Sequence, residues 1–91
     1  MILISIWISI VVRLSQLAKN ASALVLSVDV EGESDPIAVR LTELGFVAGE
    51  EVRLITTAPF GGDPILVQVG FTRFALRLSE ANRVLVEEVK V

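Results

Sequence analysis

The sequence RLTELGFVAGEEV at positions 40–52 predicts the end of a helix, two glycine turns and the start of a strand. Asp35 is placed to cap this helix, and Pro36 fits its first position, where a missing backbone N–H costs nothing. Gly45 follows the helix, where a left-handed C-cap is least costly for glycine. Gly49 fits the third position of a type II turn. The stretch therefore predicts a short helix docked tightly onto the β-structure that follows.

The apolar positions of this helix predict which side meets the core. Ile37, Leu41 and Leu44 recur at i, i+4 and i+7, so they share one face. We expect that face to be buried against the β-structure.

Around this helix, five segments have the apolar alternation and flanking turn residues of β-strands. They are residues 23–31, 51–58, 65–69, 72–78 and 83–89. In the first, Leu24, Leu26, Val28 and Val30 share one face. Residues 13–18 predict a turn that places Leu14 and Leu17 in the core, Gly70-Phe71 a two-residue hairpin loop of type II′, and residues 79–82 a single 3₁₀ turn. This order is typical of a mainly β domain, a small antiparallel barrel whose closure removes exposed edges.

Composition limits the functions that this chain can have. Its 91 residues suffice for one domain with a modest core. The net charge of −3 argues against nucleic-acid binding, which relies on a basic face. The sequence contains no cysteine and no histidine, which excludes disulfides, thiolate catalysis, histidine general bases and zinc sites with soft ligands. An apolar fraction of 53% in so small a chain predicts an exposed apolar patch, and therefore a partner, a homo-oligomer or a membrane neighbour, although the apolar residues 1–12 explain much of the excess.

Residues 1–12 form an uncharged, apolar segment with isoleucine at five successive even positions. This period of two predicts a strand, and the run is too short for a transmembrane helix. It also lacks the basic start of a secretory signal. Two interpretations stay open: an upstream extension preceding a domain of residues 13–91, or a strand that pairs with a sheet edge of its own chain or of a neighbour. We expect pairing at a subunit contact in a homo-oligomer, although simple packing explains Trp7 equally well. The expected contact residues are Ile4, Ile6, Trp7 and Ile8.

Three segments together resemble the signature of the FeoA family. They are RLTELGFV with GEEV at 40–52, APFGGDP at 58–64 and RFALR at 73–77. The likeness extends over about residues 13–88, and members commonly begin near Arg13, which favours an extension at residues 1–12. The resemblance implies an SH3-like antiparallel barrel of about five strands, with one short helix inserted after the first barrel strand.

The same resemblance implies a function without catalysis. FeoA proteins are small cytoplasmic partners of the ferrous iron transporter FeoB, so we expect a regulatory protein that binds the cytoplasmic part of an FeoB-type transporter. This partner would hold the protein at the inner face of the plasma membrane, with no direct membrane insertion and no required cofactor. Two alternatives are a self-assembling structural barrel and a metal-responsive module like the FeoA-type domain of iron-dependent repressors.

Two surfaces are candidates for partner binding. The first is the corner formed by Leu44, Gly45 and Phe46, although a core position is the favoured interpretation for Phe46 and an even alternative for Leu44. The second is a loop in which an aromatic side chain lies between a proline and two glycines, so it can contact a partner. An equally plausible interpretation is that the loop simply connects two strands of a hairpin. Its residues are Pro59, Phe60, Gly61 and Gly62.

Three carboxylates before the helix, Glu31, Glu33 and Asp35, are weak candidates for a divalent metal. Their hard oxygen atoms suit such an ion, but neither their spacing nor a histidine supports a closed site. Solvated surface charge is the favoured interpretation.

Overall fold

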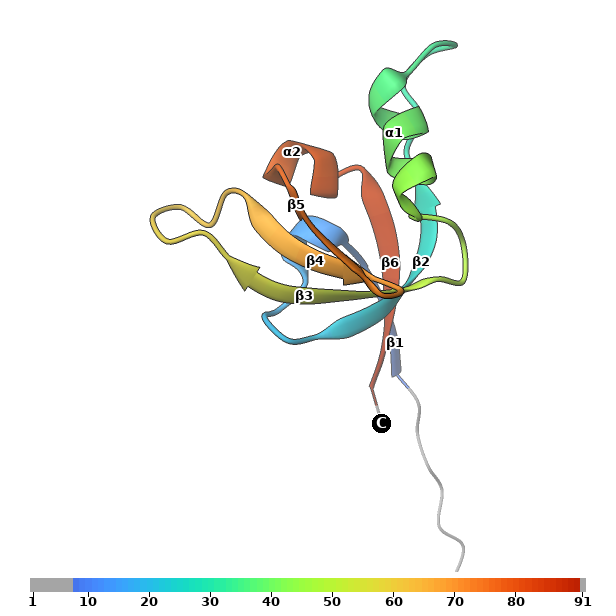
Figure 1. Ribbon diagram of the computed structural model, residues 1–91. Coiled ribbons are helices and arrows are strands. Elements are labelled where there is room, and N and C mark those ends of the chain that lie inside the picture. Colours follow the sequence, from blue (N-terminus) through green and yellow to red (C-terminus); the bar gives the residue numbers. More distant parts are fainter. Residues whose placement is uncertain (1–7, 91) are drawn as a thin grey trace, which may run out of the picture.

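A computed structural model describes the backbone of residues 8–90 and the side chains of residues 9–88 (Figure 1). Within that range six strands form one antiparallel sheet in the order β1-β6-β2-β3-β4-β5. The strands are β1 (Ile8–Arg13), β2 (Ser22–Val28), β3 (Glu51–Thr57), β4 (Ile65–Val69), β5 (Thr72–Leu76) and β6 (Val84–Lys90). The helices are α1 (Pro36–Leu44), α2 (Leu78–Ala81) and the 3₁₀ turn η1 (Leu14–Gln16). The prediction of a mainly β chain with one short helix after the first barrel strand is confirmed.

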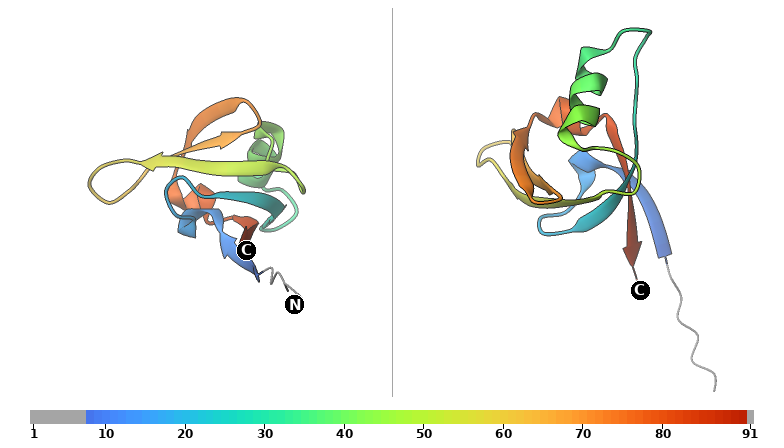
Figure 2. Two further views of the ribbon diagram at one scale, coloured as in Figure 1. Left: turned by 90° about the horizontal axis from the view of Figure 1, so that it is seen from below. Right: turned by 45° about the vertical axis from the view of Figure 1, so that its right-hand side comes forward.

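The sheet curls around a single core, while α1 stands beside it at the end where β3 begins (Figures 1 and 2). Its hydrogen-bonded order has two edges, β1 and β5. Among residues 8–90, β1 and β5 do not hydrogen-bond to each other, so the barrel is open between them. The expectation that closure leaves no exposed strand edge is therefore not met.

The helix stop at Gly45 has the predicted geometry. The Asp35 side chain accepts hydrogen bonds from the backbone N–H groups of Ile37 and Ala38, so it caps α1. At the other end Gly45 is left-handed, with φ +114°, and the Phe46 N–H donates to the Leu41 carbonyl at 3.1 Å. The chain therefore leaves the helix abruptly and drops into the core at Phe46.

Two expected faces need correction. In α1 the buried residues are Ala38 and Leu41, whereas Ile37 is 41% exposed. The first turn of α1 projects beyond the sheet (Figure 2), and Ile37 in that turn lines an open cavity instead of entering the core. In β2 the residues pointing inward are Ala23 and Val25, and the face that carries Leu24 and Leu26 points outward. β2 has apolar residues on both faces, so alternation alone did not identify the inner one.

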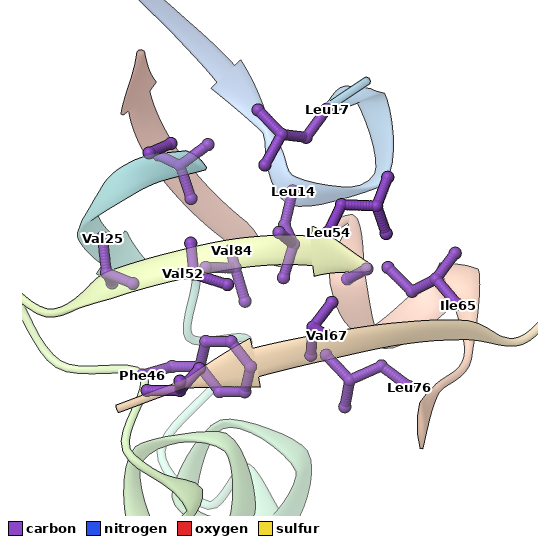
Figure 3. Close-up of a cluster of buried hydrophobic side chains, with 14 of the residues drawn as sticks. Leu14, Leu17, Val25, Phe46, Val52, Leu54, Ile65, Val67, Leu76 and Val84 are labelled. Atoms are coloured by element: carbon purple, nitrogen blue, oxygen red, sulfur yellow. The ribbon is translucent and has the colours of Figure 1, made fainter. Parts of the chain in front are cut away.

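The core lies inside the curled sheet and is closed by η1 and by Phe46, two residues after the end of α1 (Figure 3). Leu14 and Leu17 enter it as predicted. The ring of Phe46 meets that of Phe74 edge-to-face, with centroids 5.5 Å apart, an arrangement that aromatic quadrupoles favour. The other buried members come from all strands except β1. They are Ala23, Val25, Val52, Leu54, Ile65, Val67, Val69, Leu76, Val84 and Val86, with Leu41 and Ala81 from the helices.

The predicted N-terminal strand pairs within its own chain. β1 runs antiparallel to β6, from Ile8 opposite Lys90 to Arg13 opposite Leu85. Of the expected contact residues, Ile4, Ile6 and Trp7 lie outside the described residues, and Ile8 is described by its backbone alone. The boundary expected between residues 12 and 13 falls inside β1.

The segment before β6 was predicted to be a 3₁₀ turn at residues 79–82, but it forms the short α-helix α2. The N–H groups of Ala81 and Asn82 donate to the carbonyls of Arg77 and Leu78, four residues back, so α2 is a single α-helical turn, not a 3₁₀ turn. Within residues 8–90, no helix has the length and apolar character needed to cross a membrane.

Candidate functional site

The corner after α1 divides into a buried and an accessible part. Phe46 is 2% exposed, so its side chain cannot contact a partner while the fold is intact. Leu44 is half-buried and packs against the core, and Val47 is exposed. At Gly45 a β-carbon would lie 3.2 Å from the Cγ1 atom of Val69. The corner is therefore primarily a structural joint, with Leu44 and Val47 as its accessible apolar side chains.

The loop between β3 and β4 presents one aromatic side chain to solvent. Phe60 is fully exposed, and its φ is +62°, a value that non-glycine residues seldom adopt. The two residues after it, Gly61 and Gly62, also have positive φ, so the chain reverses tightly beyond Phe60. An exposed aromatic on a loop of defined shape is a suitable anchor for a partner protein.

The two candidate surfaces lie far apart. The corner precedes Glu51, the first residue of β3, and the Phe60 loop follows Thr57, its last. A seven-residue strand spans roughly 20 Å at about 3.3 Å per residue. The loop accordingly projects from one end of the barrel, and α1 stands at the other (Figure 1). The structure thus presents two separate surfaces rather than one composite site.

The carboxylate cluster before α1 is organised by Arg83, which the sequence did not indicate. Arg83 donates to the Asp29 carbonyl from Nε at 3.2 Å and from Nη2 at 2.9 Å, and its Nη2 also pairs with the Asp35 carboxylate. Asp35 accepts a further bond of 2.7 Å from the Glu31 N–H. The guanidinium and Asp35 are both largely buried, so this pair ties the start of α1 to the turn just before β6.

These contacts lower the pKa of the Asp35 carboxyl group. Hydrogen bonds from the backbone N–H groups of Glu31 and Ala38, and then the bond and charge of Arg83, hold the pKa of Asp35 below its ordinary value. Burial opposes them but does not outweigh them. In the folded protein Asp35 is therefore ionised throughout the neutral range.

This shift predicts how the stability depends on pH. A carboxylate with a depressed folded pKa contributes stability that is complete above its unfolded pKa, about 3.9, and is lost as the pH falls through the folded value. We expect the difference in unfolding free energy between the wild type and Asp35→Asn to be constant above about pH 5 and to shrink below about pH 4. Urea unfolding at a series of pH values measures this difference. A difference that stays constant down to pH 3 would contradict the role given to Asp35.

The carboxylates do not fit a metal site. Asp35 uses both oxygens for N–H donors, and Glu31 lies 3.8 Å from the Arg83 guanidinium. Elsewhere in the described part of the chain, no three acidic side chains gather in an arrangement that could hold an ion. These residues therefore do not form a closed ligand set for a divalent ion.

A second ion pair joins the two helices. Arg40 of α1 pairs with the largely buried Glu80 carboxylate, whose other oxygen accepts from the Arg77 N–H at 3.1 Å. Both line an open cavity of about 760 Å³ that also contains Ile37, Asp63 and Arg77. Glu80 neutralises Arg40, and the lining adds one further cation, Arg77, and one further anion, Asp63, so the formal charges around the cavity sum to zero.

The chain is similar to known proteins in both sequence and structure. The sequence model of one protein family, described as the FeoA domain, matches residues 12–88. The zinc complex of FeoA from Stenotrophomonas maltophilia is similar, with 57% identity, 85% of this chain and 95% of that chain covered, and a TM-score of 0.76. It is described as an SH3-domain protein for which a role as a bacterial ferrous iron transport activating factor is suggested.

Two further structures are similar. FeoA from Chlorobium tepidum has 32% identity, covering 85% of this chain and 70% of that one, with a TM-score of 0.74. A manganese-dependent transcriptional repressor has 15% identity, covering 86% of this chain and 41% of that one, with a TM-score of 0.70, and this likeness concerns the fold alone. No curated protein matches the chain.

Proposed function

The chain belongs to the FeoA family, and from this premise we propose that it is a regulatory partner that binds the cytoplasmic part of an FeoB-type ferrous iron transporter. The family supports ferrous iron transport as an accessory protein rather than as an enzyme. The observation that carries the proposal for this chain is the full exposure of Phe60 on its loop. Burying such a side chain at an interface removes a large apolar area from water.

Binding modulates transport by shifting the populations of the transporter's conformations. A partner can shift such an equilibrium only by binding one state more tightly than another. The rigid barrel holds Phe60 in place, so a pocket for it that exists in one transporter state alone would supply this difference.

Titration against the detergent-solubilised transporter tests the proposal, with and without Fe(II) and with and without nucleotide. Saturable binding is expected, and its affinity should change with the condition that favours one transporter state. If the wild-type protein fails to bind under every condition, the proposal is overturned.

A second function, self-assembly, is favoured by the edge strand β1. One side of β1 pairs with β6, and the other has no strand beside it among residues 8–90. Ile10 is 38% and Val11 55% exposed there. Such an edge can add a strand from a second copy, and antiparallel pairing about a two-fold axis gives a closed dimer.

We expect Val11→Lys to reduce assembly through this edge. Val11 lies opposite Glu87 on the outer face, so a lysine there gains a cross-strand partner and removes nothing from the core. A charge on an edge strand opposes edge-to-edge pairing. Light scattering after gel filtration is expected to show a wild-type dimer and a monomeric variant. A wild type that is monomeric at all concentrations would rule out assembly by this route.

A further inference from the structure

The outer face of α1 and the segment that leads into it enclose a groove of about 400 Å³. Val39, Thr42 and Glu43 line it from the helix, and Val30 and Glu33 from the preceding segment. This segment runs alongside α1 (Figure 2, right).

The floor of the groove is apolar and exposed. Val30 is 66% and Val39 55% exposed, so two valines that line one groove leave much of their apolar surface in water. The nearby polar groups are already satisfied: the Thr42 hydroxyl donates to the Ala38 carbonyl at 2.9 Å, and Asp35 is occupied by N–H donors and Arg83. The floor therefore offers methyl groups rather than hydrogen bonds.

The rim of the groove is acidic. Neither Glu33 nor Glu43 makes an ion pair with any side chain of residues 9–88, and no lysine or arginine lines the groove. The nearest arginines of the network are already paired, Arg83 with Asp35 and Arg40 with Glu80. An apolar floor with an uncompensated negative rim complements a segment that carries apolar and basic side chains together.

We propose that this groove binds a basic amphipathic segment of the transporter, an inference that rests on the proposed function. Cytoplasmic segments next to transmembrane helices are rich in lysine and arginine. The apolar side of such a segment would cover Val30 and Val39, and its basic side chains would face Glu33 and Glu43, as in helix-in-groove recognition. The same rim repels anionic lipid, so the occupant is the protein segment and not the membrane surface.

The groove is a second contact, separate from Phe60. It lies on α1, which stands at the end of the barrel where β3 begins, while the Phe60 loop follows the end of that strand (Figure 1). Two contacts on one rigid barrel would fix its orientation on the transporter and raise the overall affinity above that of either contact.

The double variant Glu33→Gln and Glu43→Gln tests the inference, since it removes two charges and preserves shape. Its matched control is Glu50→Gln with Glu51→Gln, which removes equal charge outside the groove. One probe is a synthetic peptide of leucine and lysine with helical spacing, checked against its scrambled form. The other probe is the solubilised transporter. We expect the groove variant to bind both about tenfold more weakly, with a smaller salt dependence, and the control variant to bind like the wild type.

The outcomes separate the two proposals. If the groove variant binds the transporter as tightly as the wild type, the groove is not the contact, and the proposed function stands. If the wild type does not bind the transporter, the proposed function falls, and with it the assignment of the segment to the transporter. In that case, peptide binding lost in the groove variant alone would still support a site for a basic segment, and its persistence would overturn the site.

Discussion

Gly45→Ala is expected to lower the free energy of unfolding by about 2–3 kcal/mol, because two separate costs coincide at this residue. The first is conformational, since φ is +114° there, well outside the range that alanine adopts readily. The second is steric, since the added β-carbon would lie 3.2 Å from Cγ1 of Val69, a buried side chain that cannot move freely. Urea unfolding of the wild type and the variant measures the sum of the two.

Gly49→Ala is the control that separates these costs. Gly49 also has a positive φ, +90°, but a β-carbon there would meet no atom within 4 Å. We expect it to cost about 1 kcal/mol, the conformational part alone. Equal losses in the two variants would show that the close approach of Gly45 to Val69 contributes nothing, and that the helix is less tightly docked than its geometry indicates.

The agreement between sequence and structure around Gly45 has a local cause. A cap, a helix stop and a tight turn depend on residues within a few positions of one another, so Asp35, Pro36, Gly45 and Gly49 were sufficient to predict them. The inward face of β2 depends instead on the strands beside it. Val25 lies opposite Val86 of β6, and this pairing decides that Leu24 points outward.

The candidate site shows the same distinction. The exposure of Phe60 follows from a loop of proline and glycine, and the burial of Phe46 was the favoured interpretation from sequence. The pairing of Arg83 with Asp35 joins residues 48 positions apart. It depends on β6 lying beside β2, which local sequence patterns do not predict. The groove was missed for a related reason: Val39 lies off the predicted apolar face of α1, and Val30 was placed in a strand that ends at Val28.

Phe60→Ala is expected to weaken binding to the transporter by about thirtyfold, which corresponds to about 2 kcal/mol, the threshold of an interface hot spot. The side chain is fully exposed, so its removal should change the unfolding free energy by no more than about 0.5 kcal/mol. Isotherms for wild type and variant against the solubilised transporter, together with urea unfolding of both, measure the two quantities.

Phe71→Ala supplies the matched control, because Phe71 is also a fully exposed phenylalanine at a turn, between β4 and β5. Val69 and Thr72 pair across that turn, and Val69 in turn lies opposite Val52 near the start of β3, so Phe71 is at the α1 end of the barrel. If burial of any exposed aromatic sufficed, the two variants would lose equal affinity, and Phe60 would have no special role. Loss in Phe60→Ala alone would assign the contact to the loop after β3. Loss in Phe71→Ala alone would move the contact to the opposite end, beside the start of β3, and would refute Phe60 as the anchor.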